Sequence, residues 1–209
     1  MSEIDKQYYG QYWSIIKKIE KMVLDYLESI LESLSTDEEH ALAEHVGSRI
    51  KRSESLIEKL ERKGLTTDVD SAIKNITDVV GVRVCTHFVG DVYTIFDALK
   101  ESERWGIVKV KDYISMPKEN GYRSLHVILS IPVTEDLIDD GFSGDRIEDV
   151  KVEIQLRTIA MDSWASLEHQ MKYKKDINNT ELIISELKRC ADEMASTDLT
   201  MQAIREMIV

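Results

Sequence analysis

The chain has 209 residues, of which 43% are hydrophobic and 32% charged, and its formal net charge is -12. These proportions suit one globular domain with a sizeable core. A surface this acidic disfavours a stable nucleic-acid partner and binding to an anionic membrane. The sequence has no apolar run of about 18 residues, so we expect no transmembrane helix and no membrane partner.

Two amphipathic helices are predicted in the N-terminal part. Apolar residues recur at helical spacing over residues 8–34, which predicts one long helix. The segment Thr36-Asp37-Glu38-Glu39 has the pattern of a capping box and predicts the start of a second helix, with Gly64 at its end. The apolar positions of that second helix are Leu42, Val46, Ile50, Ile57 and Leu60. We therefore expect residues 1–65 to be helical.

The middle of the chain changes to strand-like patterns. Strands are predicted at residues 79–88, 106–113, 122–133 and 149–158, and a short helix at 91–102. Residues 134–149 read as an acidic loop, and helical spacing returns over 159–173 and roughly 179–208. This order predicts an α/β or α+β domain, with a mixed β-sheet flanked by helices and with N- and C-terminal helical extensions.

The two cysteines, Cys85 and Cys190, show no metal-ligand spacing. We expect both to be buried thiols of a reduced protein. The first ten residues lack the basic and apolar regions of a signal peptide. Together these features favour a cytoplasmic location.

Alternation along two predicted strands gathers polar side chains on one face. Successive side chains of a strand point to opposite faces. Tyr122, Ser124 and His126 therefore share one face, opposite Arg123 and its alternating neighbours. On the last strand the polar face consists of Lys151, Glu153, Gln155 and Arg157. Such a face suits either the solvated side of a sheet or the wall of a binding site.

A basic stripe is predicted on the second helix. Lys51, Ser55 and Lys59 are spaced by four residues and so share one side of it, with Arg52 beside them. In an acidic chain such a stripe is a candidate grip for phosphate groups. Interleaved glutamates would fit a salt-bridged surface equally well.

A carboxylate stands at the start of the first predicted strand. Asp78 precedes this strand and Arg83 lies on it. A carboxylate here is often a turn or cap residue. Together with Glu153 from another strand, Asp78 could instead hold Mg²⁺, which proteins bind through one or two carboxylates plus substrate phosphates.

Four segments in this order resemble the synthetase region of the RelA/SpoT family. They are Asp78-Val-Val-Gly-Val-Arg83, Lys118-x-x-Gly121-Tyr122-Arg123-Ser124-x-His126, Val152-Glu153-Ile154-Gln155-Leu156-Arg157-Thr158, and Ala160-Met-Asp162-x-Trp164-Ala-x-x-Glu168-His169-x-x-x-Tyr173-Lys174. The resemblance runs from about Arg49 to Lys174. In size and layout the chain is similar to the stand-alone small alarmone synthetases.

This resemblance implies a GTP diphosphokinase with a nucleotidyltransferase-like fold. Such enzymes transfer the β,γ-pyrophosphate of ATP to the 3′-hydroxyl of GDP or GTP, giving (p)ppGpp and AMP. The implied organisation is a single synthetase domain over residues 1–209. It has a helical part at 1–65, a catalytic sheet core at 70–175 and a C-terminal oligomerisation helix at 178–209. Relatives assemble as homotetramers, so we expect self-association.

The resemblance also implies a role for each candidate residue. Asp78 and Glu153 would be the catalytic carboxylates and would hold Mg²⁺, the expected cofactor. The residues expected to bind ATP are Arg49, Lys51, Ser55, Lys59 and Arg83. Those expected to bind GDP or GTP are Lys118, Tyr122, Ser124, His126, Gln155, Arg157 and Asp162.

Tyr122 and Asp162 carry the expected recognition of guanine. The Tyr122 ring would stack on the base, and the Asp162 carboxylate would accept hydrogen bonds from guanine N1–H and the 2-amino group. Asp162 would also suit the first turn of a helix, where the helix dipole favours an acidic residue. Both interpretations can hold together.

Two other functions remain open at this point. Some related small synthetases use an adenine nucleotide or the tRNA 3′ end as acceptor. A non-catalytic nucleotide-binding regulator is the other alternative, although both carboxylates, Asp78 and Glu153, are present. The sequence has no adjacent His-Asp pair, the motif of the hydrolase domain in long family members. We therefore expect synthesis without hydrolysis.

Overall fold

A five-stranded mixed sheet forms the centre of the protein, in a computed structural model that describes residues 2–35, 41–102, 104–144, 146–172 and 180–208. The strands are β1 Ala43–Ile50, β2 Val80–Thr86, β3 Gly106–Asp112, β4 Leu125–Pro132 and β5 Asp149–Thr158, in the spatial order β1-β2-β5-β4-β3. Strands β2 and β5 run parallel, and the other described neighbours are antiparallel. The predicted mixed sheet with flanking helices is confirmed.

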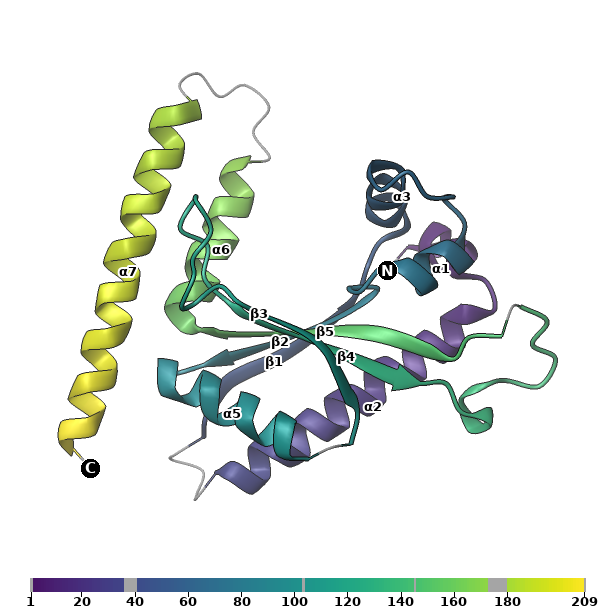
Figure 1. Cartoon of the computed structure of the whole chain (residues 1–209), viewed down its shortest axis with the longest axis horizontal. Helices are drawn as coiled ribbons and strands as arrows, with labels where there is room; N and C mark the ends of the chain where they lie inside the picture. Colours follow the sequence, from purple (N-terminus) through teal and green to yellow (C-terminus); the bar gives the residue numbers. More distant parts are fainter. Residues whose placement is uncertain (1, 36–40, 103, 145, 173–179, 209) are drawn as a thin grey trace.

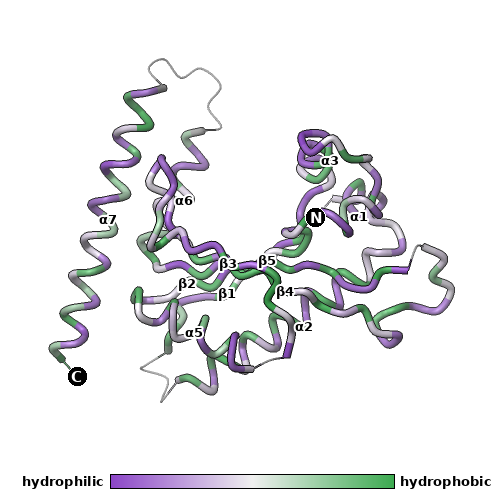
Figure 2. Tube along the Cα trace, viewed as in Figure 1, coloured by the Kyte–Doolittle hydropathy of each residue, from purple (hydrophilic) through white to green (hydrophobic). Residues whose placement is uncertain are grey.

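One face of the sheet is covered by two helices and forms the core. Helices α2 Tyr12–Leu34 and α5 Val89–Glu101 lie below the sheet in Figure 1. The apolar stripe of α2 is buried, and the strands contribute Val82, Ile154 and their alternating neighbours to the same cluster. Figure 2 shows the hydrophobic stretch along β4. Burial of these side chains supplies the main driving force for folding.

The opposite face is covered only at its two ends. Helices α1 Glu3–Tyr9 and α3 Ser53–Arg62 stand at one end, and α6 Ile159–Lys172 stands at the other (Figure 1). Helix α7 Thr180–Ile208 packs against α6, while the short α4 Val69–Asn75 contacts α3. Over the described residues, the middle of this face carries a groove between α3 and α6.

The predicted N-terminal helices are wrong in two places. The single helix expected over residues 8–34 is interrupted at Gly10, whose φ of 53° lies in the left-handed region. The first half of the second expected helix is strand β1, which pairs with β2 along its length. Only α3 is helical there, so residues 1–65 are not all helical. The capping pattern at residues 36–39 lies outside the described residues.

The later elements agree with the predictions more closely. Strand β5 has the predicted bounds, and β2, β3, α5, α6 and α7 differ from them by a few residues. Strand β4 begins at Leu125 rather than Tyr122, and a short 3-10 helix, Glu135–Leu137, lies within the predicted loop. The Tyr173-Lys174 end of the family-like segment lies outside the described residues. Across the described helices, none is both long and apolar enough to cross a membrane.

Candidate active site

The open face of the sheet carries polar side chains in two neighbouring rows. Residues that pair across neighbouring strands form these rows. One row consists of Gly47, Arg83, Gln155 and His126, and the next of Arg49, Gly81 and Glu153. Side chains paired across strands point to the same face. The alternating residues Val82 and Ile154 lie in the core below. The predicted parity of β5 is thus confirmed.

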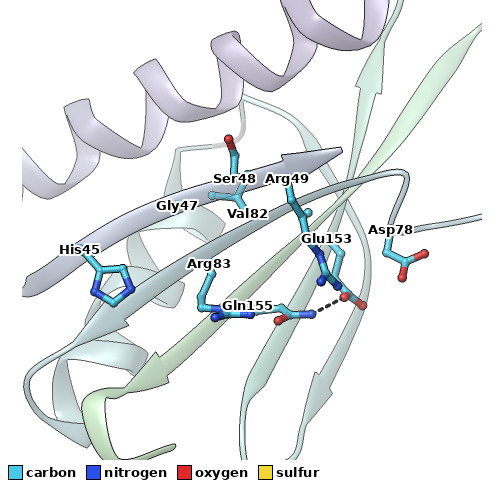
Figure 3. A pocket seen from close by; sticks show the side chains of 10 residues that line it. His45, Gly47, Ser48, Arg49, Asp78, Val82, Arg83, Glu153 and Gln155 are labelled. Carbon is cyan, nitrogen blue, oxygen red and sulfur yellow. Dashed lines mark hydrogen bonds between the residues drawn. The ribbon is translucent and has the colours of Figure 1, made fainter. Parts of the chain in front are cut away.

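These rows border a cavity of about 230 Å³. Figure 3 shows Arg49, Arg83 and Gln155 around the same space as Asp78 and Glu153. A larger groove continues past Arg49 toward α3 and α6. Its lining includes Ser48, Lys51, Arg52, Ser55 and His169. Arg49, Lys51, Ser55 and Arg83, which are expected to bind ATP, therefore line the cavity or the groove beside it. Lys59 lines neither, but it forms an ion pair with Asp78 of the cavity.

Asp78 forms two ion pairs at the edge of this cavity. Lys51 Nζ lies 2.8 Å from its Oδ2 and Lys59 Nζ lies 2.8 Å from its Oδ1. Burial raises the pKa of the Asp78 carboxyl, but the hydrogen bonds and charges of the two lysines outweigh burial and lower it overall. Lys51 and Lys59 do converge, although Lys51 precedes α3 and the helical stripe expected for it is wrong.

Glu153 is the second carboxylate of the cavity and is 7% exposed. His126 Nδ1 lies 3.2 Å from its Oε1, and Gln155 Nε2 donates to its Oε2 at 2.7 Å. Burial raises the pKa of Glu153, and the charge of Asp78 adds to that rise. The interactions with His126 and Gln155 together outweigh these two effects and hold the pKa of Glu153 below its usual value. Both carboxyls are therefore ionised at neutral pH.

Arg157 joins the residues expected to bind the acceptor nucleotide and is 5% exposed. Its Nη2 donates to the Tyr122 hydroxyl at 2.5 Å and to Gln155 Oε1 at 2.8 Å. Its Nε donates to Ser124 Oγ at 3.2 Å and its Nη1 to Asp162 Oδ1 at 3.2 Å. One buried guanidinium thus fixes four polar side chains from different segments.

Tyr122 lies between a turn and strand β4. The turn closes with Gly121 N–H donating to Lys118 O at 2.8 Å. The Tyr122 hydroxyl is 2.8 Å from His126 Nε2, and Lys118 Nζ lies 4.6 Å from the centre of the Tyr122 ring. Burial raises the pKa of this tyrosine, so the hydroxyl stays protonated. Tyr122 and Ser124 face the site as predicted, even though they precede β4.

Asp162 connects the two halves of the site. It lies in the first turn of α6, and its Oδ1 forms an ion pair with Arg83 Nη1 at 3.0 Å and accepts a hydrogen bond from Arg157. Arg83 was expected to bind ATP and Asp162 to bind guanine, so this ion pair crosses the expected boundary between the two substrates. Nothing in the spacing of the sequence indicates it.

The structure adds side chains that sequence reasoning missed. His45 and Ser48 come from β1, and both line the cavity or the groove. Arg52, expected beside the basic stripe, follows that strand and lines the groove. Gly47 was the available signal, because a glycine within a helix is unfavourable. Cys85 is buried as expected, with its pKa raised to about 11 by burial. The expectation for Cys190 is wrong, because it is exposed on α7.

Comparison with known proteins gives consistent matches. A family model described as a region found in RelA/SpoT proteins matches residues 48–178. The chain is 39% identical to the GTP pyrophosphokinase YwaC of Bacillus subtilis over 94% of this chain and 91% of that protein. The small alarmone synthetase 2 from B. subtilis is 40% identical, with a TM-score of 0.73 over 94% of this chain and 99% of that one. The small alarmone synthetase 1 from B. subtilis, bound to its product pppGpp, is 30% identical, with a TM-score of 0.80 over 98% and 99% of the two chains.

Proposed function

The chain belongs to the RelA/SpoT family, and on that premise we propose that it is a (p)ppGpp synthetase. It would transfer the β,γ-pyrophosphate of ATP to the 3′-hydroxyl of GDP or GTP and release AMP. The observation that carries the proposal is one cavity lined by two ionised carboxylates, Asp78 and Glu153, and by two arginines, Arg49 and Arg83. Its neighbour Tyr122 supplies an aromatic ring for the acceptor base.

The donor nucleotide would occupy the cavity between β1 and β2 and the groove beside it. The planar guanidinium groups of Arg49 and Arg83 can stack on adenine. Lys51, which lies at the boundary with the groove, and Lys59 can bind phosphate oxygens as point charges. Both lysines are paired with Asp78, so an arriving triphosphate would compete with that carboxylate for them.

The donor set of Asp78 and Glu153 suits Mg²⁺. Both are hard oxygen ligands, both are ionised, and both line one cavity. These two residues would hold the ion together with substrate phosphates. When bound, Mg²⁺ supplies positive charge that stabilises the transferring group.

The acceptor nucleotide would lie against Tyr122. The ring is already in contact with cations, because Lys118 Nζ lies 4.6 Å and Arg157 Cζ 5.1 Å from its centre. A guanine stacked on the ring would displace one of them. The Asp162 carboxylate can accept from guanine N1–H and the 2-amino group, a donor pair that adenine lacks. This pairing favours GDP or GTP over an adenine acceptor.

Glu153 would accept the proton of the attacking 3′-hydroxyl. Its lowered pKa keeps its oxygens free of protons at neutral pH, which is the form that a general base requires. His126 Nδ1 lies 3.2 Å from Oε1 and holds the carboxylate in place. The same His126 contacts the Tyr122 hydroxyl through Nε2, so it links the base to the acceptor ring.

The experiment is incubation with ATP, Mg²⁺ and one acceptor at a time: GDP, GTP, AMP or tRNA, with products separated by anion exchange. AMP together with a guanosine carrying a 3′-diphosphate is the expected result. Product from AMP or tRNA alone would overturn the choice of acceptor. The variant Glu153→Ala should abolish turnover while still binding both nucleotides; full turnover in this variant would remove its catalytic role.

Two further properties of the protein follow from the same proposal. Helix α7 exposes several large apolar side chains, namely Leu182, Ile184, Leu199, Met201, Ile204, Met207 and Ile208. We propose that the protein assembles as a homotetramer in which these side chains are buried. A monomeric mass by light scattering would contradict this assembly. Synthesis is proposed without hydrolysis, so added ppGpp should not release pyrophosphate.

A further inference from the structure

Helix α7 is attached to the rest of the protein along one face. The inward positions recur at helical spacing and are Leu187, Ala191, Asp198, Gln202 and Arg205. Leu187 O accepts from Trp164 Nε1 at 2.9 Å, and Asp198 accepts from the Thr158 hydroxyl at 2.5 Å. The large exposed apolar residues of α7 are outside this set. One face of α7 therefore packs against the rest of the same chain.

The N-terminal half of α7 touches the turn that precedes Tyr122. Gly121 has a φ of 88°, and a Cβ placed on it would lie 2.5 Å from Ala191 Cβ and 3.3 Å from Lys188 Cα. Any larger residue would collide with the helix as well as strain the backbone. Figure 1 shows the loop between β3 and β4 beside α6 and α7. The turn and the helix are therefore in close contact at Gly121.

Arg123 ties this turn to α7. Its Nη1 donates to Gly121 O at 3.3 Å and to Ala191 O at 3.4 Å, and its Nη2 lies 3.1 Å from Asp192 Oδ1. The side chain is 18% exposed. The side chains of Tyr122 and Ser124 instead contact Arg157. Arg123 therefore reaches the site only through the backbone on either side of Tyr122.

Tyr122 is also packed on the junction of α6 and α7. Its ring rests against a small cluster formed by Trp164, Leu187 and Ala191, with the Tyr122 and Trp164 ring centres 6.4 Å apart. This cluster is separate from the main core and exists because α7 is docked. The position of the ring expected to stack on guanine thus depends on α7 from two sides.

We propose that α7 is a structural part of the acceptor site and that Arg123 is its positioning residue. The inference rests on the proposed function, since it concerns binding of the acceptor at Tyr122. With Arg123 in place, Tyr122 is held before the base arrives, so less ordering is needed on binding. Without it, the acceptor must order the turn itself, and the KM for GDP rises. In the part of the chain that the structure describes, Arg49 and Lys59 on the proposed donor side lie outside the contacts of Arg123.

The test compares two arginine-to-methionine variants that each remove a contact between α7 and the rest of the chain, one at Asp192 and the other at Arg205. Arg123→Met should raise the KM for GDP about tenfold and leave the KM for ATP within about twofold, because it removes charge-assisted hydrogen bonds. Arg205→Met removes an ion pair with Asp91 at the far end of the same helix. It should change neither KM by more than about twofold. Arg123→Lys should restore part of the affinity.

A second variant removes the partner of Arg123 on α7. Asp192 is 53% exposed and pairs with Arg123 from α7. Asp192→Ala should raise the KM for GDP about threefold in the wild type and have little further effect in Arg123→Met, since both changes break one interaction. Circular dichroism and thermal unfolding of each variant establish that the chain is folded.

Three results would overturn the inference: no change in the KM for GDP in Arg123→Met, equal changes for ATP and GDP, or the same change in Arg205→Met. Amide hydrogen exchange in residues 119–122 provides a readout that does not depend on activity. Faster exchange in Arg123→Met than in Arg205→Met is expected, and equal exchange refutes the link. If the wild type makes no product, the proposed function fails, whereas the exchange comparison still decides whether α7 holds this turn.

Discussion

Replacing Arg157 by methionine removes the buried guanidinium at the centre of the proposed acceptor side. The change leaves Ser124 Oγ, Gln155 Oε1 and the Tyr122 hydroxyl without this donor. It also removes one of the two guanidinium partners of Asp162. Methionine keeps the length of the apolar stem, so the loss is mainly that of charge and hydrogen bonds.

The size of the effect follows from burial. Removing one partner of a buried ion pair costs about 3–5 kcal/mol. Asp162 keeps Arg83 at 3.0 Å and its side chain is 17% exposed, which places the cost near the lower end, about 3 kcal/mol. In a chain of 209 residues, each kcal/mol lowers Tm by about 2–4 °C. Arg157→Met should therefore lower Tm by about 6–12 °C.

Arg189 offers a matched control on the surface of α7. It also forms two ion pairs, with Glu186 and Glu193, but its side chain is 62% exposed. Exposed pairs contribute little to stability because water screens them, so Arg189→Met should lower Tm much less than Arg157→Met does. Differential scanning calorimetry of both variants in one buffer makes the comparison. Equal shifts in the two variants would refute the view that Arg157 holds the site through buried bonds.

Three other predictions concern separate parts of the protein. Hydrogen bonds from Ser2 and Ser53 lower the pKa of Asp5, so its contribution to stability is present above the unfolded-state pKa and is lost as the pH falls through the folded value. The destabilisation of Asp5→Asn, measured by urea unfolding, should therefore shrink below about pH 4, and a constant deficit would contradict this. Asp162→Ala should raise the KM for GDP far more than that for ATP in steady-state assays, and equal effects would remove its role at the guanine edge. Iodoacetamide at neutral pH should label exposed Cys190 and spare Cys85, whose pKa is raised to about 11 by burial; mass spectrometry that found both labelled would disprove it.

Strand β5 shows what could be predicted from sequence. Val152, Ile154 and Leu156 are all fully buried, and the residues between them face the cavity. A strand with one apolar and one polar face has a period that no helix shares. The alternation of residue types along this segment was therefore enough to predict that Glu153, Gln155 and Arg157 share one face.

Strand β1 shows where the same reasoning failed. Leu42, Val46 and Ile50 are four residues apart, and a spacing of four fits the helical period as well as the strand period of two. The pattern therefore could not distinguish the two structures. Pairing with β2 decided the outcome, since Arg49 lies opposite Gly81 in the antiparallel register. Such a partner lies about thirty residues away and leaves no local signal.

The ion pairs of the site could not be predicted for a related reason. The family-like segments placed Arg83 and Asp162 in different parts of the site, yet the two are 3.0 Å apart. Their contact arises because α6 starts directly after β5, beside β2. Spacing along the chain contains no information on such a contact, because the contact depends on the orientation of α6 relative to the sheet.

These contacts also bear on how a chain of net charge -12 would bind the proposed nucleotides, which are themselves anionic. Four cations in the described part of the site already have carboxylate partners: Lys51 and Lys59 share Asp78, and Arg83 and Arg157 share Asp162. Binding of a phosphate or of guanine is then an exchange of partners, in which the protein carboxylate released can take up Mg²⁺ or the donor groups of the base. Because each ligand group would replace a carboxylate partner that the cation already has, we expect selectivity to depend on geometry more than on total charge.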